Sequence, residues 1–242
     1  MGDQQTELHL LNCFLRGRIS RRELLMRSVA LGVGTGTLAS IAGSASAQDA
    51  TPTGEIVWAL ESNVPNVIPF GGIATATWWG KEFMYDSLLA WDADLNVIPA
   101  LAESWETSDS INYTIKLRQG VKFHDGGEMT AKDVVYSITT AVNPPEPGIQ
   151  VPYLANIASA EAVDDYTVTI TMSKPDPTLT GVLAWSAYTP IVPEGLLDRV
   201  NVLSAGIGTG PFKLVEYNQD DSIVYEAFTD FWEPGVPKIQ KL

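Results

Sequence analysis

Apolar and polar positions alternate most clearly between residues 111 and 117. Ile111, Tyr113, Ile115 and Leu117 are separated by polar residues, the period of a strand with one buried face. The Asp125-Gly126-Gly127 sequence that follows is typical of a turn containing a positive φ. The pattern therefore predicts a half-buried strand over 111–117, followed by a tight turn.

A helix is predicted over 130–142. Thr130 and Asp133 have the spacing of a capping box, with aspartate in place of the usual glutamate or glutamine. The apolar positions Val134, Val135, Ile138 and Val142 recur approximately on one face. The proline-rich segment 143–148 then ends the helix.

The remaining pattern mixes strands and helices without strict alternation, which favours an α/β chain of mixed α+β type. We expect strands at 55–60, 166–172 (with Val163 before its turn) and 238–242. Helices are expected at 77–89, from Pro99 and at 178–185. We also expect a turn between short strands at 92–96, and a hairpin of 212–216 with 222–227 joined at 218–221.

The N-terminus resembles an export signal over residues 1–47. A basic leader precedes an apolar stretch at 29–42, and Ala45-Ser46-Ala47 has the small-x-small form of a signal-peptidase site. Arg21 and Arg22 lie in a sequence similar to the twin-arginine signal, although the general secretory route stays open. A membrane anchor is disfavoured because a span needs about 20 apolar residues. Residues 48–53 are expected to form a linker.

Composition narrows the class of protein further. The single cysteine, Cys13, lies inside the leader, so we expect no lipoprotein anchor and no disulfide in the mature chain. Removing the leader, with its five arginines and three acids, changes the formal net charge from −14 to −16. A surface this acidic argues against nucleic-acid binding.

Candidate catalytic chemistry is sparse. The only histidines are His9, in the leader, and His124, which we interpret as part of a strand end and turn. The acidic pairs at 164–165 and 220–221 lie in predicted turns. The sequence has no GxSxG nucleophile motif, no Cys/His cluster and no calcium-loop motif. We therefore expect no catalytic residue, no metal site and no cofactor, and a secreted hydrolase has little support.

Five motifs in a fixed order carry a family resemblance. They are LAESW at 101–105, LRQGVKFHDG at 117–126, TAKDVVYSI at 130–138, VDDYTVTITM at 163–172 and GTGPFKLVEY at 208–217. Together with 228–242 they resemble the family-5 extracellular solute-binding proteins, the dipeptide, oligopeptide and nickel receptors of ABC importers. The resemblance runs from about Gly54 to the last residue.

The resemblance implies a lobe like that of type II periplasmic binding proteins, with an inserted subdomain. Residues 54–72 and 173–242 would form the core subdomain of the first lobe, and 73–172 the inserted one. The family continues into a second lobe that we expect to be absent here, because the sequence stops at Leu242. The chain would then be a fragment or the product of a truncated gene.

The resemblance also implies where a solute binds, between two lobes that close by hinge motion. In the loop after the first strand, the Glu61 carboxylate could pair a ligand amine or be an exposed loop acid. Aromatic residues near the cleft are further candidates, with packing as their alternative role. Gly210, near the expected hinge and cleft floor, is more readily explained by backbone geometry than by ligand contact. The candidate ligand-binding residues are Glu61, Ser62, Asn63, Trp78, Trp185, Tyr188 and Gly210, while Trp58, Trp91 and Trp105 are expected in the core.

The function implied is an exported, monomeric receptor in the periplasm or an equivalent extracytoplasmic space. It would capture a solute, with peptides the first choice, and deliver it to the permease subunits of an ABC importer. A lone lobe is expected to bind weakly or not at all. The alternatives left open are a nickel or other small-solute receptor of the same family, and a remnant that binds nothing.

Overall fold

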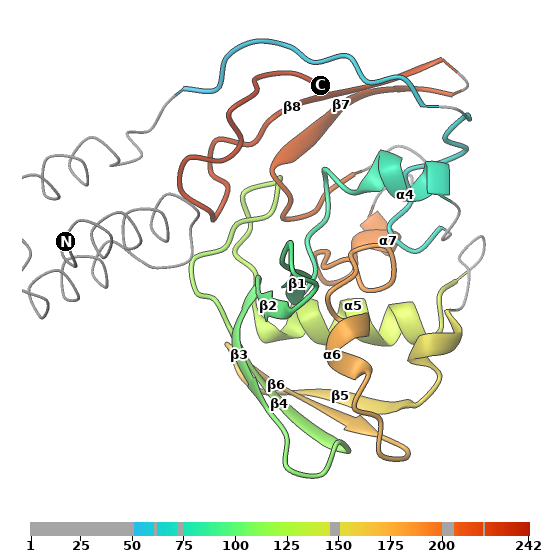
Figure 1. The fold of residues 1–242 in the computed structure, drawn as a ribbon, viewed down its shortest axis with the longest axis vertical. Helices are drawn as coiled ribbons and strands as arrows, with labels where there is room; N and C mark the ends of the chain where they lie inside the picture. The colour runs from blue at the N-terminus through green and yellow to red at the C-terminus, as the bar shows by residue number, and fades with distance from the viewer. Residues whose placement is uncertain (1–50, 61, 72–74, 146–150, 200–205, 220) are drawn as a thin grey trace, which may run out of the picture. The chain divides into compact units, whose positions relative to one another are not determined.

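The computed structural model describes residues 51–60, 62–71, 75–145, 151–199, 206–219 and 221–242 (Figure 1). Residues Thr51–Leu242 form one compact unit. The predicted export signal, with Arg21, Arg22, Ala45 and Ala47, lies outside the described residues, as do Glu61 and residues 48–50 of the predicted linker.

A four-stranded antiparallel sheet contains the predicted strand at its centre. Its strands are β3 (Ala102–Glu106), β4 (Asn112–Leu117), β5 (Ile157–Asp164) and β6 (Thr167–Met172), in the order β3-β4-β6-β5. Tyr113, Ile115 and Leu117 of β4 are at most 3% exposed, which confirms the predicted alternation. Ile115 pairs with Val168, so the buried faces of β4 and β6 coincide.

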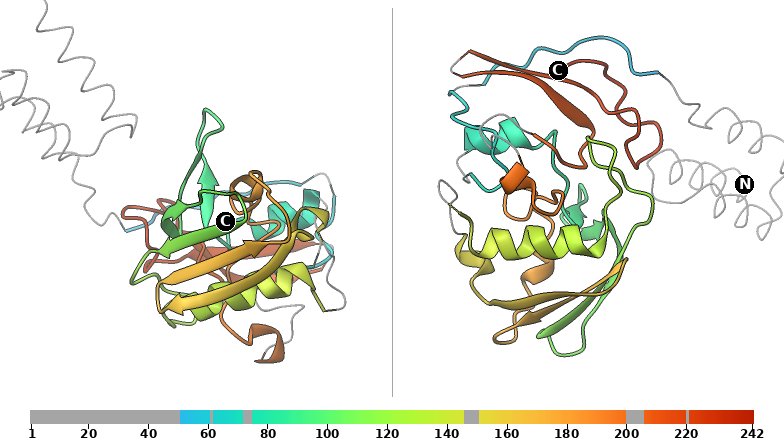
Figure 2. Two further views of the ribbon diagram at one scale, coloured as in Figure 1. Left: turned by 90° about the horizontal axis from the view of Figure 1, so that it is seen from below. Right: turned by 180° about the vertical axis from the view of Figure 1, so that it is seen from behind.

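Helix α5 (Ala131–Val142) covers one face of this sheet (Figure 2). Thr130 is its N-cap, and the predicted capping box with Asp133 is present. The Asp133 carboxylate accepts the backbone N–H of Thr130 at 2.8 Å and that of Glu194 at 2.8 Å. Asp133 therefore closes the first turn of α5 and fixes the chain around residue 194 to it.

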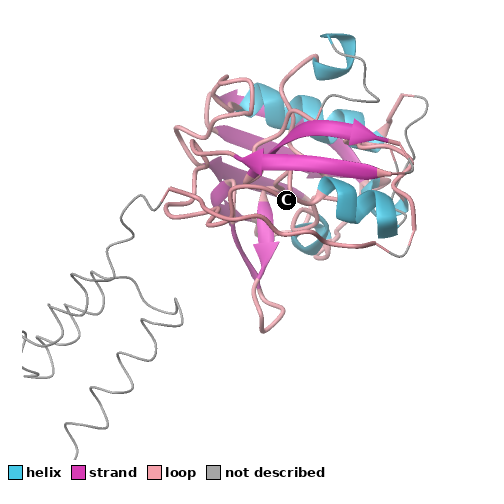
Figure 3. Cartoon of the chain, turned by 90° about the horizontal axis from the view of Figure 1, so that it is seen from above, coloured by secondary structure: helices cyan, strands magenta, loops and turns pink. Residues whose placement is uncertain are grey.

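The hairpin of β7 (Phe212–Asn218) and β8 (Ser222–Ala227) confirms the prediction made for these residues. Figure 3 views this hairpin from above, with the C terminus lying alongside. Tyr225 and Leu242 exchange backbone hydrogen bonds of 2.9 and 3.1 Å, and Lys241 bridges to Glu55. The end of the chain thus lies along β8 without forming the full strand predicted at 238–242.

The strand predicted at 55–60 is wrong beyond its first residue. Only Glu55 makes a bridge, although Ile56 also donates its N–H to the carbonyl of Lys241. The apolar side chains that follow are exposed, with Val57 at 88%. The sequence has a strand pattern here, but the described residues provide no neighbouring strand with which 57–60 could form a ladder.

The helix predicted at 77–89 ends earlier, as α4 (Thr75–Lys81). Its predicted continuation contains Met84, Tyr85, Leu88 and Leu89, which are all at most 1% exposed. Most of this segment is buried, and a buried apolar run has no clear helical period to distinguish it from an irregular buried chain.

The helix predicted from Pro99 is also wrong, because Pro99 ends strand β2 (Val97–Pro99) and 102–106 pairs with β4. Strand β2 pairs with β1 (Leu89–Trp91) around the turn predicted at 92–96, which is confirmed. The helix predicted at 178–185 forms only as α6 (Leu179–Val182). Short helical segments also occur as η1 (Pro152–Leu154) and α7 (Leu196–Arg199).

The assignment of 54–72 with 173–242 to one subdomain and of 73–172 to another stays a prediction. All four strands of the main sheet, and α5, fall within 73–172. Among the helices of the described residues, none has the length and apolar character needed to cross a bilayer.

Replacing Asp133 by alanine should destabilise the chain measurably. The change leaves the N–H groups of Thr130 and Glu194 without their acceptor, which costs about 1–3 kcal/mol, and the Tm should fall by roughly 2–4 °C for each kcal/mol. Thermal unfolding followed by circular dichroism measures the effect. Lys132→Ala, an exposed position on the same helix, is the control, and equal Tm values for the two variants would contradict the role of Asp133.

Candidate functional site

Six aromatic side chains form a continuous row, which we call the aromatic ridge. Ring centroids are 4.9 Å apart for Trp58–Trp79, 4.9 Å for Trp79–Trp78, 5.2 Å for Trp78–Trp185, 5.8 Å for Trp185–Tyr188 and 5.6 Å for Tyr188–Tyr153. The ridge thus joins segments up to 130 residues apart in the sequence. It contains three of the predicted ligand-binding residues, namely Trp78, Trp185 and Tyr188.

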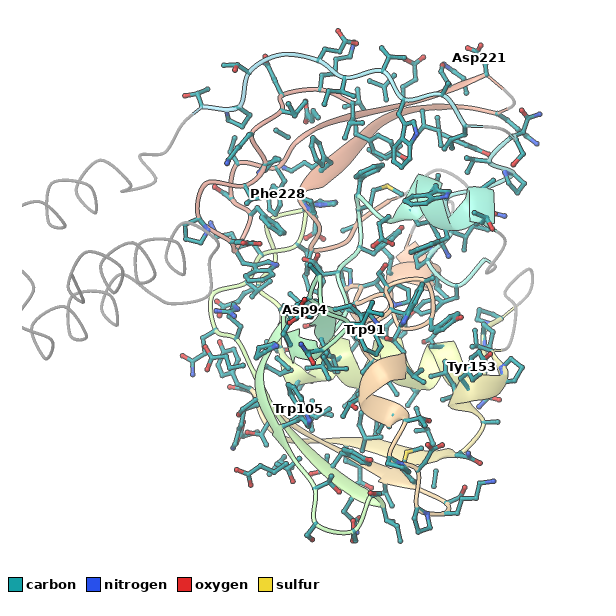
Figure 4. The ribbon with its side chains drawn as sticks, viewed as in Figure 1. Trp91, Asp94, Trp105, Tyr153, Asp221 and Phe228 are labelled. Carbon is teal, nitrogen blue, oxygen red and sulfur yellow. The ribbon has the colours of Figure 1, made fainter. Side chains whose placement is uncertain are left out.

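Four short segments position these rings, and Trp58 lies on the one that follows Glu55. Helix α4 carries the stacked pair Trp78 and Trp79. The turn after α6 carries Trp185 and Tyr188, and its backbone is closed by the Tyr188 N–H donating to the Trp185 carbonyl at 3.0 Å. Tyr153, labelled in Figure 4, belongs to η1 and is 61% exposed.

The tryptophans expected in the core divide into two groups. Trp58 is 48% exposed and Trp91 is 38% exposed, so that expectation is wrong for both. Trp58 lies on the unpaired segment after Glu55, and Trp91 ends a three-residue strand in a short hairpin, labelled in Figure 4. Trp105 is partly buried and packs against the core, as expected.

A first cavity, of about 490 Å³, lies between the segment 55–64 and the β7–β8 hairpin. Ser62 and Asn63 line it, together with Trp58 and Trp79 of the ridge. The Tyr217 hydroxyl donates to the carbonyl of Val64 at 2.8 Å and so fixes one end of this segment to β7. Two further predicted site residues are thereby brought beside the ridge.

A second cavity, of about 550 Å³, is bordered by other rings of the ridge, and we call it the acidic cavity. Trp78, Trp91 and Trp185 line it together with two carboxylates, Glu82 and Asp86. Sequence reasoning missed both acids because they lay inside an overlong predicted helix. Their spacing of four residues, just after a pair of tryptophans, was the signal available.

Burial perturbs both carboxylates of the acidic cavity. It raises the pKa of Asp86 to about 7, against the hydrogen bond that the indole N–H of Trp232 donates to Asp86 at 2.9 Å. Burial also raises the pKa of Glu82, against a hydrogen bond of 2.8 Å from the Ser186 hydroxyl. Both groups therefore hold a proton more readily than exposed acids do.

The glycine-rich loop at 206–210 packs against the backbone of Met84. The Gly210 N–H donates to the Met84 carbonyl at 3.0 Å, and a Cβ on Gly210 would lie 2.5 Å from the Met84 carbonyl carbon. A Cβ on Gly208 would lie 2.2 Å from the same carbonyl's oxygen. The contacts described for Gly210 are with other protein groups, and its role as a ligand residue stays a prediction.

His124 fixes this loop to the turn after β4. Its Nε2 donates to the Gly210 carbonyl at 2.8 Å, and its Nδ1 accepts the Gly208 N–H at 3.3 Å and lies 3.2 Å from the Gly206 carbonyl oxygen. Phe228, labelled in Figure 4, contacts the ring edge-on at 5.0 Å. Burial lowers the pKa of the imidazole, so the neutral ring is favoured. Both ring nitrogens are thus engaged with backbone.

The arrangement suits binding through apolar area and a few polar groups. Within the described residues, no group of three or more His, Cys, Asp or Glu side chains is placed to hold a metal ion.

Gly210→Ala should destabilise the chain, because its new Cβ meets backbone atoms that cannot move aside independently. The expected loss is about 1–3 kcal/mol, as for overpacked cores, measured by urea unfolding. The control is Gly127→Ala, whose Cβ would lie 3.3 Å from the end of the Asp125 side chain. A Gly210→Ala variant as stable as wild type would show that this contact is not tight.

Comparisons with known proteins place these features in a family. The glutathione-binding protein GsiB of Escherichia coli K12 is 32% identical over 216 residues, which are 88% of this chain and 41% of GsiB. The chain therefore spans about two fifths of the length of the curated relatives it matches.

Solved structures agree with this likeness. The periplasmic binding protein DppA of Helicobacter pylori, in complex with the peptide STSA, is 27% identical with a TM-score of 0.65, covering 74% of this chain and 39% of DppA. NikZ of Campylobacter jejuni, in complex with Ni(L-His), is 26% identical with a TM-score of 0.60, covering 75% and 35%. These likenesses support the mixed α/β, type II periplasmic-binding-protein fold inferred from the sequence.

A family model also matches the chain. Residues 96–242, more than half of the chain, match the middle region of the bacterial extracellular solute-binding proteins, family 5. They include β3, β4, α5, the glycine-rich loop and the β7–β8 hairpin. The chain belongs to the bacterial extracellular solute-binding proteins of family 5.

Proposed function

We propose that this chain forms the solute-binding surface of an extracytoplasmic receptor that serves an ABC importer, with peptides as the solute. The observation that carries the proposal is the aromatic ridge, whose rings line two cavities. Aromatic rings offer a large apolar area with polar edges, a common composition of small-molecule clefts. Relatives whose names or titles specify glutathione or a peptide support the choice of solute.

The role proposed is capture rather than chemical conversion. The single histidine of residues 51–242 has both ring nitrogens engaged with the glycine-rich loop. A general base needs a free nitrogen within hydrogen-bond reach of a reacting group. We therefore propose a receptor without catalytic residues, metal or cofactor, whose partners are the solute and the permease subunits of the importer.

Export and location complete the proposal. The leader at 1–47, with Arg21-Arg22 and the small residues Ala45 and Ala47, would direct export by the twin-arginine route and be removed after Ala47. The product would be a monomer in the periplasm or an equivalent extracytoplasmic space. It would carry no lipid, because no cysteine follows the expected cleavage site.

Peptide binding should shift the NMR signals of the aromatic ridge and leave those of residues outside it unchanged. All seven tryptophans lie in residues 51–242, and each gives one indole N–H signal in a ¹H–¹⁵N correlation spectrum. Millimolar di- to tetrapeptides, corresponding to about −4 kcal/mol, should shift the signals of Trp78, Trp79 and Trp185. Trp105, on β3 and outside the ridge, should stay in place.

Trp185→Leu removes one ring from the middle of the ridge and should weaken peptide binding by about tenfold, which is equivalent to about 1.4 kcal/mol. A parallel titration with a Ni(L-His) complex tests the nickel alternative in the same spectra. Shifts with nickel but not with peptides would overturn the peptide assignment. Shifts spread equally over Trp105 and the ridge, or none with either solute, would overturn the ridge as the binding surface.

The exported product should begin at Gln48. Mass spectrometry of the protein recovered from the extracytoplasmic fraction should give the mass of residues 48–242 without an acyl chain. Replacing both Arg21 and Arg22 by lysine should leave the precursor in the cytoplasm if the twin-arginine route is used. Continued export of the double variant would assign the chain to the general secretory route.

A further inference from the structure

The acidic cavity differs in character from the rest of the ridge. Its walls are the rings of Trp78, Trp91 and Trp185, and its charged groups are the carboxylates of Glu82 and Asp86. The remaining lining residues are Tyr85, Ser87, Leu89, Ala90, Leu95, Ala100, Ala184 and Ser186. The lining therefore includes two acids and no lysine, arginine or histidine.

Neither carboxylate is neutralised by a basic residue of the lining. Asp86 accepts its hydrogen bond from the neutral indole of Trp232, and its charged neighbours, Glu82 and Glu233, are both acidic. Glu82 has one basic neighbour, Lys81, whose ammonium donates to the Pro69 carbonyl at 2.9 Å. A cation entering the cavity would relieve the cost of holding two carboxylates away from water.

The rings favour the same kind of group. The faces of tryptophan rings attract cations, most strongly where water is excluded. Trp78 and Trp185 lie 5.2 Å apart with their planes inclined by 43°, and both border the cavity. Trp91 reaches the cavity from β1, on a separate hairpin (Figure 4). Carboxylates and aromatic faces thus surround one volume of about 550 Å³.

We propose that the acidic cavity is a subsite for a cationic group of the solute, an alkylammonium or guanidinium, held by Glu82 and Asp86 beside the rings of Trp78, Trp91 and Trp185. The inference rests on the proposed function and adds a preference to it. Solutes that present a positive side chain or amine would be favoured over neutral ones of the same size. The first cavity, beside Ser62 and Asn63, would take the remainder of the solute.

The test compares benzylamine, which is cationic at pH 8, with benzyl alcohol, its neutral counterpart of nearly equal size. Titration of the full chain is followed by the indole signals of Trp78, Trp91 and Trp185. Benzylamine should shift these three signals at concentrations at least about tenfold lower than benzyl alcohol. Affinity for benzylamine should also rise from pH 6 to pH 8, because a carboxyl with a pKa of about 7 is mostly protonated at the lower value and mostly ionised at the higher.

Variants distinguish the contribution of the two carboxylates to benzylamine binding from the effect of the protein's overall charge. Glu82→Gln and Asp86→Asn should each weaken benzylamine binding by about tenfold and leave benzyl alcohol unchanged. Glu103→Gln removes the same charge from an exposed position on β3 outside the cavity and should have no effect. Trp91→Leu, on the partly exposed wall, should weaken benzylamine binding and provides a second variant should either acid variant fail to fold.

Equal affinity for the amine and the alcohol, or full affinity in both acid variants, would overturn the subsite. The peptide titration distinguishes this failure from failure of the proposed function. If peptides shift the ridge signals but benzylamine is not preferred over benzyl alcohol, the subsite is contradicted and the proposed function is not. A benzylamine preference that depends on Glu82 and Asp86, without any response to peptides, keeps the cation subsite and removes the peptide assignment.

Discussion

The close approach of the glycine-rich loop to Met84 is the constraint on which the rest of the site depends. Gly208 and Gly210 lie where any Cβ would collide with the backbone of residues 83 and 84. The contact fixes the chain between α4 and β1, which has no regular secondary structure of its own. His124 attaches the same loop to the turn after β4. Three distant segments are thereby held at one point without a disulfide or metal among the described residues.

The segment between α4 and β1 positions the acidic side chains of the site. It begins at the end of α4, which carries Trp78 and Trp79, and it contains Glu82 and Asp86. Because its backbone is held from one side by the loop, its acids are directed into a cavity that aromatic rings complete. The same burial that excludes water raises their pKa values. Rigidity, burial and charge are therefore consequences of one packing arrangement.

Local signals explain which parts of the fold could be predicted from the sequence. Strand β4, helix α5 with its Thr130–Asp133 cap, and the β7–β8 hairpin each have a period or a turn that specifies the element. The order of the five motifs likewise indicates the family. The short α4 and the unpaired 57–60 could not be predicted, because the burial of the segment after α4 and the lack of a strand beside 57–60 depend on tertiary structure.

The candidate site was predictable only in part for the same reason. Residue type alone suggested Trp78, Trp185 and Tyr188, and the structure brings them together in one row. Residue type could not show that Trp58 and Tyr153 extend that row, or that Glu82 and Asp86 share a cavity with three tryptophans. Such groupings depend on long-range contacts, which have no local period.

Native-state hydrogen exchange of two amides tests the central role of the glycine-rich loop most directly. They are the Gly210 N–H, bonded to the Met84 carbonyl, and the His124 N–H, bonded to the Gly208 carbonyl at 2.9 Å. If the loop holds the site together, both should exchange only through global unfolding, as slowly as the amides of β4. Exchange at the rate of an exposed loop, while β4 stays protected, would contradict the account.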